Sequence, residues 1–307
     1  EVCKTLNPRP AVEGYEILDE LGKGPSATVY LARQAMSKKT VALKVFSPEA
    51  TRDREAVRAL HREGVISSSL EHENIARVYD IDEEGGFHFI AMEHVDGVPL
   101  PALLEHYGRF DPMQASRILQ SISAGLAYAH RSGISHGSLL PENVLIDRQT
   151  GRVVLTDFGV SRAMAARWGA EAEARAGFVA PEQAAGAPPD ERSDIFALGA
   201  LLYCMLSGER PQPGLVSAPG AALPRMPRLR TLCPQVPIWL ETVVARCMAS
   251  EPHDRFAGAA EVADEIEAGL EADEEPPVPR SLPLGPDDGE DPGEEPLLDE
   301  DAAEDGS

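Results

Sequence analysis

Asn143 and Asp157 lie on either side of a short apolar run, and their types and spacing suit phosphoryl transfer. Amide and carboxylate oxygens are ligands for Mg²⁺, and a general base placed before the Asn would orient the attacking hydroxyl. Ser138 holds that base position, five residues before Asn143, where an Asp is expected. The pattern therefore predicts a phosphoryl-transfer centre that keeps its metal ligands and lacks its base.

A second candidate site is a glycine-rich stretch that runs from Leu21 to Val29 between two expected strands. Glycines at such a turn let backbone N–H groups approach phosphates closely. Lys44 follows on the next expected strand and is placed to reach phosphates, and Glu63 on the following helix is a candidate to pair with it. Each feature alone is more often a turn or a surface charge, but their order along the chain predicts a nucleotide site.

The elements that must position these residues change in kind near residue 96. Before it, β-rich runs flank one helical segment; the strands are expected at residues 15–21, 28–32, 40–46, 75–81 and 87–92, and the helix at 52–70. After it, helices dominate; they are expected at residues 111–130, with Asp111 as N-cap, and at 194–208, 237–249 and 258–270, with two short strands at 144–146 and 153–155. The fold class is therefore α+β.

The net charge of −23 is unevenly distributed. Residues 271–307 hold 15 acidic residues and one Arg, and residues 1–270 hold 36 acidic and 27 basic residues. Such a balance argues against general nucleic-acid binding, which needs Lys and Arg to displace counterions. The Pro-rich acidic stretch is expected to be a disordered tail, acting as a solvated linker, a docking segment for a basic partner or a tether.

No stretch reaches the roughly 18–20 apolar residues of a membrane span. The four cysteines have no ligand-like spacing, which fits reduced thiols in a cytoplasmic domain. The chain starts at Glu1 and not at Met, so whether a membrane segment or sensor domain lies outside it stays open. The domain is expected to be cytoplasmic or the cytoplasmic part of a membrane protein.

Together these motifs resemble the eukaryotic-like protein kinase family, and more closely the bacterial Ser/Thr kinases. The resemblance implies a bilobal kinase fold with a small β-rich N-lobe and a larger helical C-lobe. The expected boundaries are a leader at residues 1–13, an N-lobe at 14–95, a C-lobe at 96–270 and the tail at 271–307.

The resemblance also implies ATP and Mg²⁺ as cofactors. Asn143 and Asp157 would hold Mg²⁺, and Lys44 would hold the phosphates and pair with Glu63. The remaining nucleotide contacts would come from the glycine-rich loop, the adenine-packing residues, the gatekeeper Met92 and the hinge that begins at Glu93: Leu21, Gly22, Gly24, Val29, Ala42, Met92, Glu93 and Val95. Glu182 would pair with Arg255, and Asp194 would anchor the catalytic loop; both roles are structural.

The catalytic loop departs from the family pattern His-Arg-Asp-Leu-Lys-Pro-Glu-Asn at three positions. Gly137 replaces the Arg, Ser138 the base Asp, and Leu140 the Lys that neutralises the γ-phosphate. The Thr that bridges that Asp and Lys falls on Arg175. Between Arg162 and Pro181 there is no Ser, Thr or Tyr that could carry an activation-loop phosphate. The Arg that would receive such a phosphate is also absent, because Gly137 replaces it.

Two functions remain open. One is a degenerate kinase domain that binds Mg·ATP and serves as a signalling scaffold or allosteric switch for a protein partner. The other is a Ser/Thr protein kinase that phosphorylates protein substrates with an atypical catalytic loop, because positioning and metal charge carry much of phosphoryl transfer. In that case Glu171 or Glu173 is a conceivable replacement base. The oligomeric state is not predictable from these features.

Overall fold

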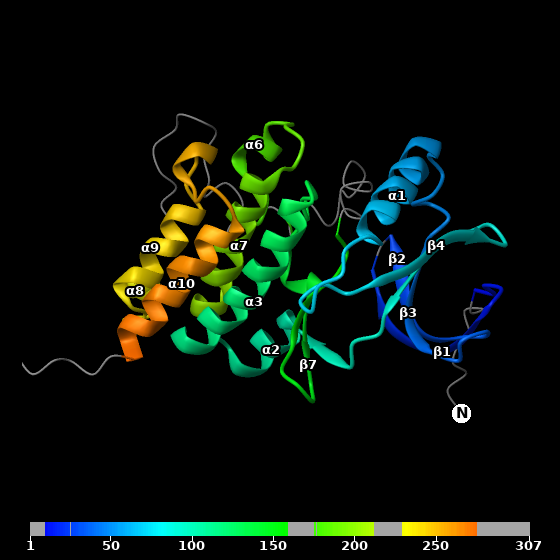
Figure 1. Ribbon diagram of the computed structural model, residues 1–307, viewed down its shortest axis with the longest axis horizontal. Coiled ribbons are helices and arrows are strands. Elements are labelled where there is room, and N and C mark those ends of the chain that lie inside the picture. Colours follow the sequence, from blue (N-terminus) through cyan, green and yellow to red (C-terminus); the bar gives the residue numbers. More distant parts are fainter. Residues whose placement is uncertain (1–9, 25, 159–174, 176, 212–228, 275–307) are drawn as a thin grey trace, which may run out of the picture.

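The computed structural model describes residues 10–24, 26–158, 175, 177–211 and 229–274, which form two lobes (Figure 1). The first lobe is an antiparallel sheet with a helix on one face, and the second is a bundle of helices. A small three-stranded sheet lies between them. The expected α+β fold class, with a β-rich first lobe and a helical second lobe, is confirmed.

The first-lobe sheet has the order β1-β2-β3-β5-β4, and each neighbouring pair is antiparallel. Its strands are β1 (Tyr15–Lys23), β2 (Ala27–Gln34), β3 (Thr40–Phe46), β4 (Val78–Glu84) and β5 (Phe87–Glu93). The central strand β3 is apolar on both faces, since Val41 and Leu43 pack in one core while Ala42 and Phe46 pack in the other. Lys44 is its one charged residue, on the same face as Ala42.

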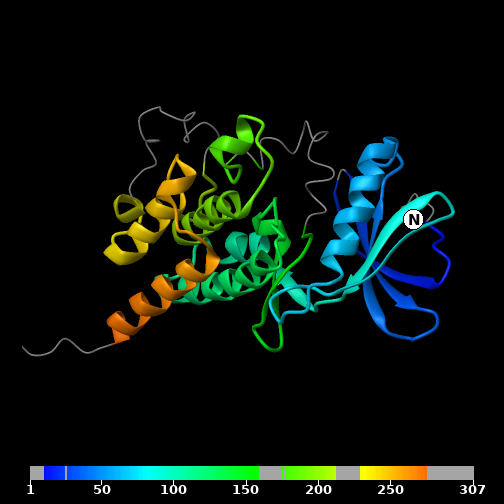
Figure 2. The ribbon, with the colours of Figure 1, turned by 45° about the horizontal axis from the view of Figure 1, so that its top comes forward.

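Helix α1 (Arg54–Ser67) lies across one face of this sheet (Figure 2). Asp53 caps it by accepting a hydrogen bond from the Glu55 backbone N–H at 2.9 Å. Gly64 lowers helix propensity, yet it is needed here because a Cβ at this position would lie 2.1 Å from Cδ1 of Ile81 on β4. The close approach at Gly64 therefore sets the packing distance between α1 and the sheet.

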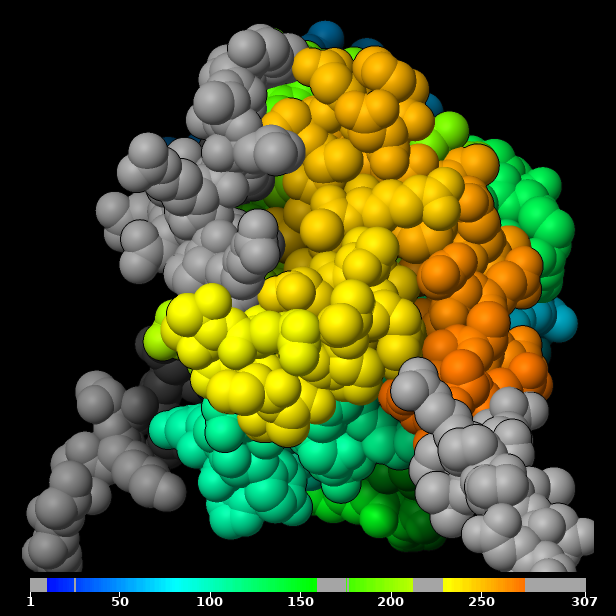
Figure 3. All heavy atoms as spheres, turned by 90° about the vertical axis from the view of Figure 1, so that its left-hand side faces the viewer, coloured from blue at the N-terminus to red at the C-terminus, as the bar shows by residue number. Residues whose placement is uncertain are grey.

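The second lobe is built around α7 (Glu191–Ser207), which is buried almost all round, as expected from its apolar sequence. Its neighbours are α2 (Leu100–Tyr107), α3 (Pro112–Arg131), α6 (Pro181–Ala184), α8 (Leu229–Leu232), α9 (Ile238–Cys247), α10 (Ala259–Glu274) and the 3₁₀ helices η1 (Pro141–Asn143) and η3 (Pro252–Asp254). Figure 3 shows α9 and α10 side by side on the end of the molecule far from the first lobe. None of the described helices has the length and hydrophobicity of a bilayer-crossing segment.

The strands β6 (Gly97–Pro99), β7 (Val144–Asp147) and β8 (Val153–Leu155) form the small sheet. Most expected elements are present within a few residues of their expected bounds, and Asp111 caps α3 by accepting from the Gln114 N–H. Strand β4 begins later than expected, because Ile75 instead makes an isolated parallel bridge to Leu155. Strand β6 and helix α2 were not expected, and α10 continues past residue 270 to Glu274.

Arg255 is the anchor that joins α6 to the rest of the second lobe. Its guanidinium donates to both carboxylate oxygens of Glu182, at 2.7 and 2.8 Å, which confirms the expected pair. Its remaining N–H groups donate to backbone carbonyls of Ala249, Arg192 and Ser250. The side chain is 0% exposed, so all of its donors depend on these partners.

Replacing Arg255 by Met should lower the free energy of unfolding by about 3–5 kcal/mol, because the Glu182 carboxylate would lose the cation that compensates its partial burial. The matched change Arg148→Met removes an ion pair with Asp96 that is mostly exposed, so it should cost about 0–1 kcal/mol. Urea unfolding of both variants checks this. Equal losses would show that the Arg255 pair is no more than a surface interaction.

Candidate active site

Three adjacent strands bring the expected nucleotide residues together. Val29 on β2 is registered opposite Lys44 on β3, and Ala42 on β3 opposite Met92 on β5. Val29 is half-buried, and Ala42 and Met92 are buried in the core under α1. Val29, Ala42 and Met92 therefore provide apolar contacts that suit a nucleotide base, and Lys44 lies beside them where it could bind a phosphate.

The glycine-rich stretch forms the turn between β1 and β2. Leu21 and Gly22 lie near the end of β1, which is Lys23, and Gly22 is registered opposite Val29. The Gly24 N–H donates to the Ala27 carbonyl at 2.9 Å, which closes the turn. A Cβ at Gly22 would meet no atom within 4 Å, so this side of the turn is open to a ligand.

The expected hinge is tied to the second lobe by an ion pair that the sequence analysis did not foresee. The Glu93 carboxylate binds the guanidinium of Arg152, which precedes β8, and the Glu93 N–H donates to the Arg77 carbonyl at 2.8 Å. Val95 follows and is buried in a small cluster with Ala76 and Val154. The link between the lobes is thus held by both polar and apolar contacts.

Lys44 forms an ion pair with Asp157, whereas the family resemblance implied Glu63 as its partner. The Lys44 Nζ atom lies 2.8 Å from Oδ2 of Asp157, and both side chains are largely buried. Asp157 has φ +66°, a left-handed conformation that is strained for a residue with a side chain. The ammonium is held by the carboxylate that follows β8, so this contact joins β3 to the second lobe.

The catalytic loop is organised by the buried carboxylate of Asp194 on α7, as expected. Its two oxygens accept the backbone N–H groups of His136, at 2.7 Å, and Gly137, at 2.8 Å. The ring of His130, on α3, lies 2.9 Å away as a third partner. Gly137 has φ +73°, which costs a glycine little, so this residue suits the sharp bend that presents both N–H groups.

His136 has a structural role in the catalytic loop. Its Nε2 lies 3.0 Å from the Thr156 carbonyl, and its ring packs on that of Phe158 with centroids 4.5 Å apart. Its Nδ1 accepts the Ser138 N–H at 3.4 Å. A neutral ring protonated on Nε2 satisfies both bonds, and burial lowers the pKa of His136 from its ordinary value.

Asn143 is oriented as a metal ligand would need to be. Its side-chain NH₂ donates to the Ser138 carbonyl at 3.0 Å, which leaves the amide oxygen for another partner. Its backbone carbonyl accepts the Thr156 N–H at 2.9 Å, next to Asp157. One amide oxygen and one carboxylate beside the Lys44 ammonium form a donor set that fits Mg²⁺ and a phosphate chain.

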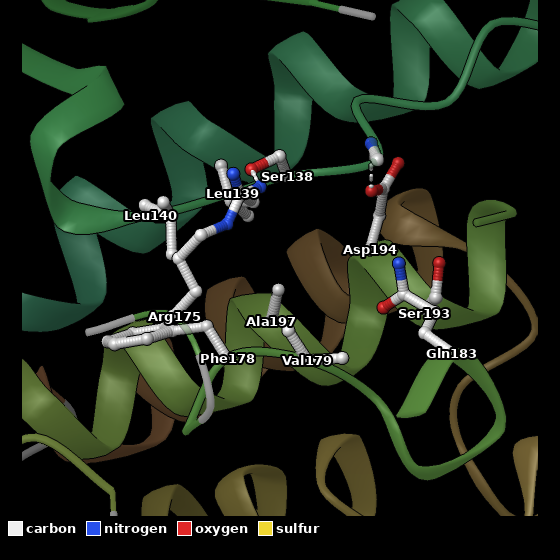
Figure 4. Close-up of a pocket in the computed structure, with 11 residues that line it drawn as sticks. Ser138, Leu139, Leu140, Arg175, Phe178, Val179, Gln183, Ser193, Asp194 and Ala197 are labelled. Atoms are coloured by element: carbon white, nitrogen blue, oxygen red, sulfur yellow. Dashed lines mark hydrogen bonds between the residues drawn. The ribbon is translucent and has the colours of Figure 1, made fainter. Parts of the chain in front are cut away.

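Ser138, at the position of the base, is covered by Arg175. It is 8% exposed, and its hydroxyl accepts a hydrogen bond from the Arg175 guanidinium (Figure 4). The two residues line a pocket with Leu140, Phe178 and Gln183. The sequence had aligned Arg175 with this cluster, but no local pattern indicates that its side chain reaches Ser138.

The remaining candidates have a limited part in the site. Phe178 is buried and packs in the core of the second lobe. Within the described residues no group of three or more His, Cys, Asp or Glu side chains has the arrangement of a metal site. Glu171, Glu173 and most of the acidic tail lie outside the described residues.

Comparison with known proteins places these features in one family. Residues 15–264 match the family model for the protein kinase domain. The chain is 33% identical over 266 residues to the serine/threonine-protein kinase PrkC of Bacillus subtilis, covering 84% of this chain and 41% of PrkC. It is 33% identical over 261 residues to PknB of Mycobacterium leprae, covering 81% of this chain and 42% of PknB. The chain thus spans less than half the length of these relatives.

Solved structures agree with this placement. The crystal structure of the Mycobacterium tuberculosis PknI kinase domain superposes with a TM-score of 0.71 at 28% sequence identity. The match covers 84% of this chain and 97% of the PknI chain. The likeness therefore extends over both lobes and confirms the expected bilobal kinase fold.

Lowering the pH should destabilise the fold through His136. The unfolded chain binds a proton at this residue below a pKa of about 6.5, while the lowered pKa of the buried ring keeps it neutral in the folded state. The free energy of unfolding should therefore fall as pH decreases from about 7.5 to about 5.5, and stability should be regained on raising it. Urea unfolding across this range is the measurement.

Two variants isolate the contribution of His136. His136→Gln keeps a donor and an acceptor but does not titrate, so its stability should depend less on pH than that of the wild type. His253→Gln changes a histidine on the surface and should retain the full dependence. Identical pH slopes for His136→Gln and wild type would show that His136 does not carry the effect.

Proposed function

Because the chain belongs to the protein kinase family, we propose that it binds Mg·ATP, transfers the γ-phosphate poorly and acts as a signalling scaffold or allosteric switch. The observation that carries this proposal is the state of the base position. Ser138 is neutral, nearly buried and hydrogen-bonded to a guanidinium. The nucleotide residues, by contrast, lie together on strands and loops that do not depend on Ser138 for a charge.

The proposed loss of activity follows from the chemistry of this cluster. A positioned general base contributes about 10²–10⁴ in rate, and a serine hydroxyl is a poor substitute at neutral pH. Leu140 supplies no charge to the transferring phosphate, and such an electrostatic contact is often worth several kcal/mol. An incoming hydroxyl would also have to displace the Arg175 guanidinium from Ser138. The three effects act on the same step.

The proposed binding of nucleotide has separate support. Asp157 and the Asn143 amide oxygen would hold Mg²⁺, and Lys44 would hold phosphate oxygens, while Ala42 and Met92 would contact the base. The metal, when bound, neutralises phosphate charge. None of these contacts uses the missing carboxylate.

A switch role is supported by the way the lobes are joined. Lys44 on β3 and Asp157 after β8 link the two lobes directly, so a ligand that engages both would change the contact between them. A protein partner would read that change. We place the domain in the cytoplasm, either free or as the cytoplasmic part of a larger membrane protein.

The second candidate is a working Ser/Thr protein kinase. Its support is that PrkC and PknB are named serine/threonine-protein kinases, and that Asn143 and Asp157 remain. Phosphoryl transfer through a loose transition state depends more on positioning and on metal charge than on a general base. Direct measurement of transfer separates the two candidates.

Millimolar Mg·ATP should raise the melting temperature of the protein. Ligand at about 100 times its Kd stabilises the folded state by about 2.7 kcal/mol, which for a domain of this size is a shift of several degrees. Asp157→Ala should reduce the shift, whereas Asp264→Ala on the exposed side of α10 should retain it. Wild-type protein that melts at the same temperature with and without Mg·ATP would contradict nucleotide binding.

Transfer of labelled γ-phosphate to a general protein substrate should be at background level for the wild type. A background-level signal is identified by comparison with Asp157→Ala, which lacks a metal ligand. Strong labelling by the wild type that disappears in Asp157→Ala would favour the active kinase and overturn the impaired one.

Restoring the missing groups should restore transfer. Ser138→Asp with Leu140→Lys returns the base and the cation, but the new carboxylate would lie beside Arg175 and pair with it. We therefore expect the further change Arg175→Thr to give the larger gain. The increase should reach about 10²–10⁴ if the base is the main lesion, measured as initial rate at saturating ATP. No gain in either variant would place the lesion elsewhere.

A further inference from the structure

The outer face of α1 is a basic surface in a strongly acidic chain. The residues that this helix exposes are Arg54, Glu55, Arg58, Arg62, Val65 and Ile66. Its three arginines are spaced four residues apart, so they lie in one stripe along the side of the helix that faces away from the sheet. The whole chain has a net charge of −23, so this stripe is opposite in sign to most of the molecule.

The arginine stripe has no electrostatic partner in the part of the chain that the structure describes. None of the guanidinium groups of Arg54, Arg58 and Arg62 forms an ion pair with another described residue. Like charges four residues apart on a helix repel one another, so the stripe weakens α1 on its own. A group of negative charges lying over the stripe would remove this repulsion.

Two exposed apolar side chains extend the stripe at the end of the helix. Val65 is 66% exposed and Ile66 is 42% exposed, and both lie in the last turn of α1, after Arg62. We call the three arginines together with Val65 and Ile66 the α1 stripe. Guanidinium groups beside exposed apolar side chains suit an acidic segment that also carries large apolar residues.

The chain contains a segment of this composition. Residues 287–307 hold 11 acidic residues and no Lys or Arg. Within them, residues 294–301 read Glu-Glu-Pro-Leu-Leu-Asp-Glu-Asp, so that Leu297 and Leu298 have acidic residues on both sides. We call residues 294–301 the acidic segment. It matches the α1 stripe both in charge and in its pair of apolar residues.

The length of chain before the acidic segment is sufficient for it to reach α1. Helix α10 ends at Glu274, at the end of the molecule opposite α1 (Figure 1). Residues 275–296 can span up to roughly 70–80 Å when extended. A compact domain of this size has a diameter on the order of 50 Å. The tail can therefore connect the end of α10 to the far lobe of the same chain.

We infer that the acidic segment docks on the α1 stripe of its own chain. Its carboxylates would pair with the guanidinium groups, and its two leucines would cover Val65 and Ile66. The contact goes beyond the proposed function and does not depend on nucleotide binding. Because α1 carries Glu63 and packs on the sheet that holds Lys44, the docked tail would restrain a helix next to the candidate active site.

The test is photochemical cross-linking within the full chain. A benzoylphenylalanine in place of Leu298 keeps a large apolar side chain at that position and reacts with its neighbours on irradiation. Mass spectrometry should locate the cross-links in α1, in protein that still runs as a monomer on a denaturing gel. Because the Debye length is about 3 Å at 1 M salt, the yield should fall severalfold when salt is raised to about 1 M.

Charge reversal in the α1 stripe should remove most of the cross-linking. Arg58→Glu with Arg62→Glu places like charges opposite the acidic segment, so the yield should fall about tenfold. Lys38→Glu with Lys39→Glu is the matched control, since it changes the net charge equally at an exposed turn of the same lobe. This control should keep the wild-type yield.

An exchange of charges tests direct contact. Adding Glu294→Arg and Glu295→Arg to the variant with Arg58→Glu and Arg62→Glu brings opposite charges together again, so part of the yield should return. Melting curves check that every variant is folded. If charge reversal prevents folding, Arg58→Gln with Arg62→Gln removes the charges without reversing them and should also lower the yield.

Other results would overturn the inference. Cross-linked dimers would show that the tail docks on a second copy and not on its own chain. Cross-links scattered over the surface, or absent, would show that the acidic segment has no site on α1. An equal yield in the arginine and lysine variants would show that the stripe does not attract the tail.

None of these results depends on whether the domain binds Mg·ATP, so the proposed function stands or fails separately.

Discussion

The rest of the site depends on one buried charge, the carboxylate of Asp194. It is 1% exposed, and its oxygens are satisfied in the interior by two backbone N–H groups and the His130 ring. Those same N–H groups belong to the catalytic loop, so the need to satisfy the carboxylate fixes the loop. Ser138 and Asn143 take their positions from that constraint.

The constraint explains how the catalytic loop can hold its shape without charged side chains at positions 137, 138 and 140. The bonds to Asp194 come from backbone N–H groups, and the bonds of His136 reach a backbone carbonyl and Phe158. Replacement of the side chains at 137, 138 and 140 leaves these bonds in place. The backbone bonds that shape the loop are therefore independent of the side chains at positions 137, 138 and 140.

Much of the fold follows from local pattern, because alternating apolar residues, helix caps and glycine turns act over short distances. Strands β3 and β8 have their expected bounds, and the Asp111 cap forms as expected. Strand β6 and α2 were missed because each is short and their apolar residues show no clear period. The family motifs also predicted the Asp194 and Glu182 contacts correctly.

The remaining site contacts could not be predicted because they join residues far apart in the sequence. Arg175 reaches Ser138 only after the second lobe has folded, and Arg152 reaches Glu93 only after the two lobes have packed together. Nor does the sequence determine which carboxylate meets Lys44: Glu63 and Asp157 are both candidates, and the choice depends on where α1 lies and on the left-handed backbone at Asp157.

The ion pair between Lys44 and Asp157 affects which ligands the candidate active site would bind. An anion that binds the Lys44 ammonium alone would separate it from Asp157, and a cation that binds the Asp157 carboxylate alone would separate it from Lys44. In either case one largely buried charge would lose its counterion. A complex that carries both signs replaces the two partners together. If the site binds a metal and its polyanion, this single ion pair would favour the complex over either component alone.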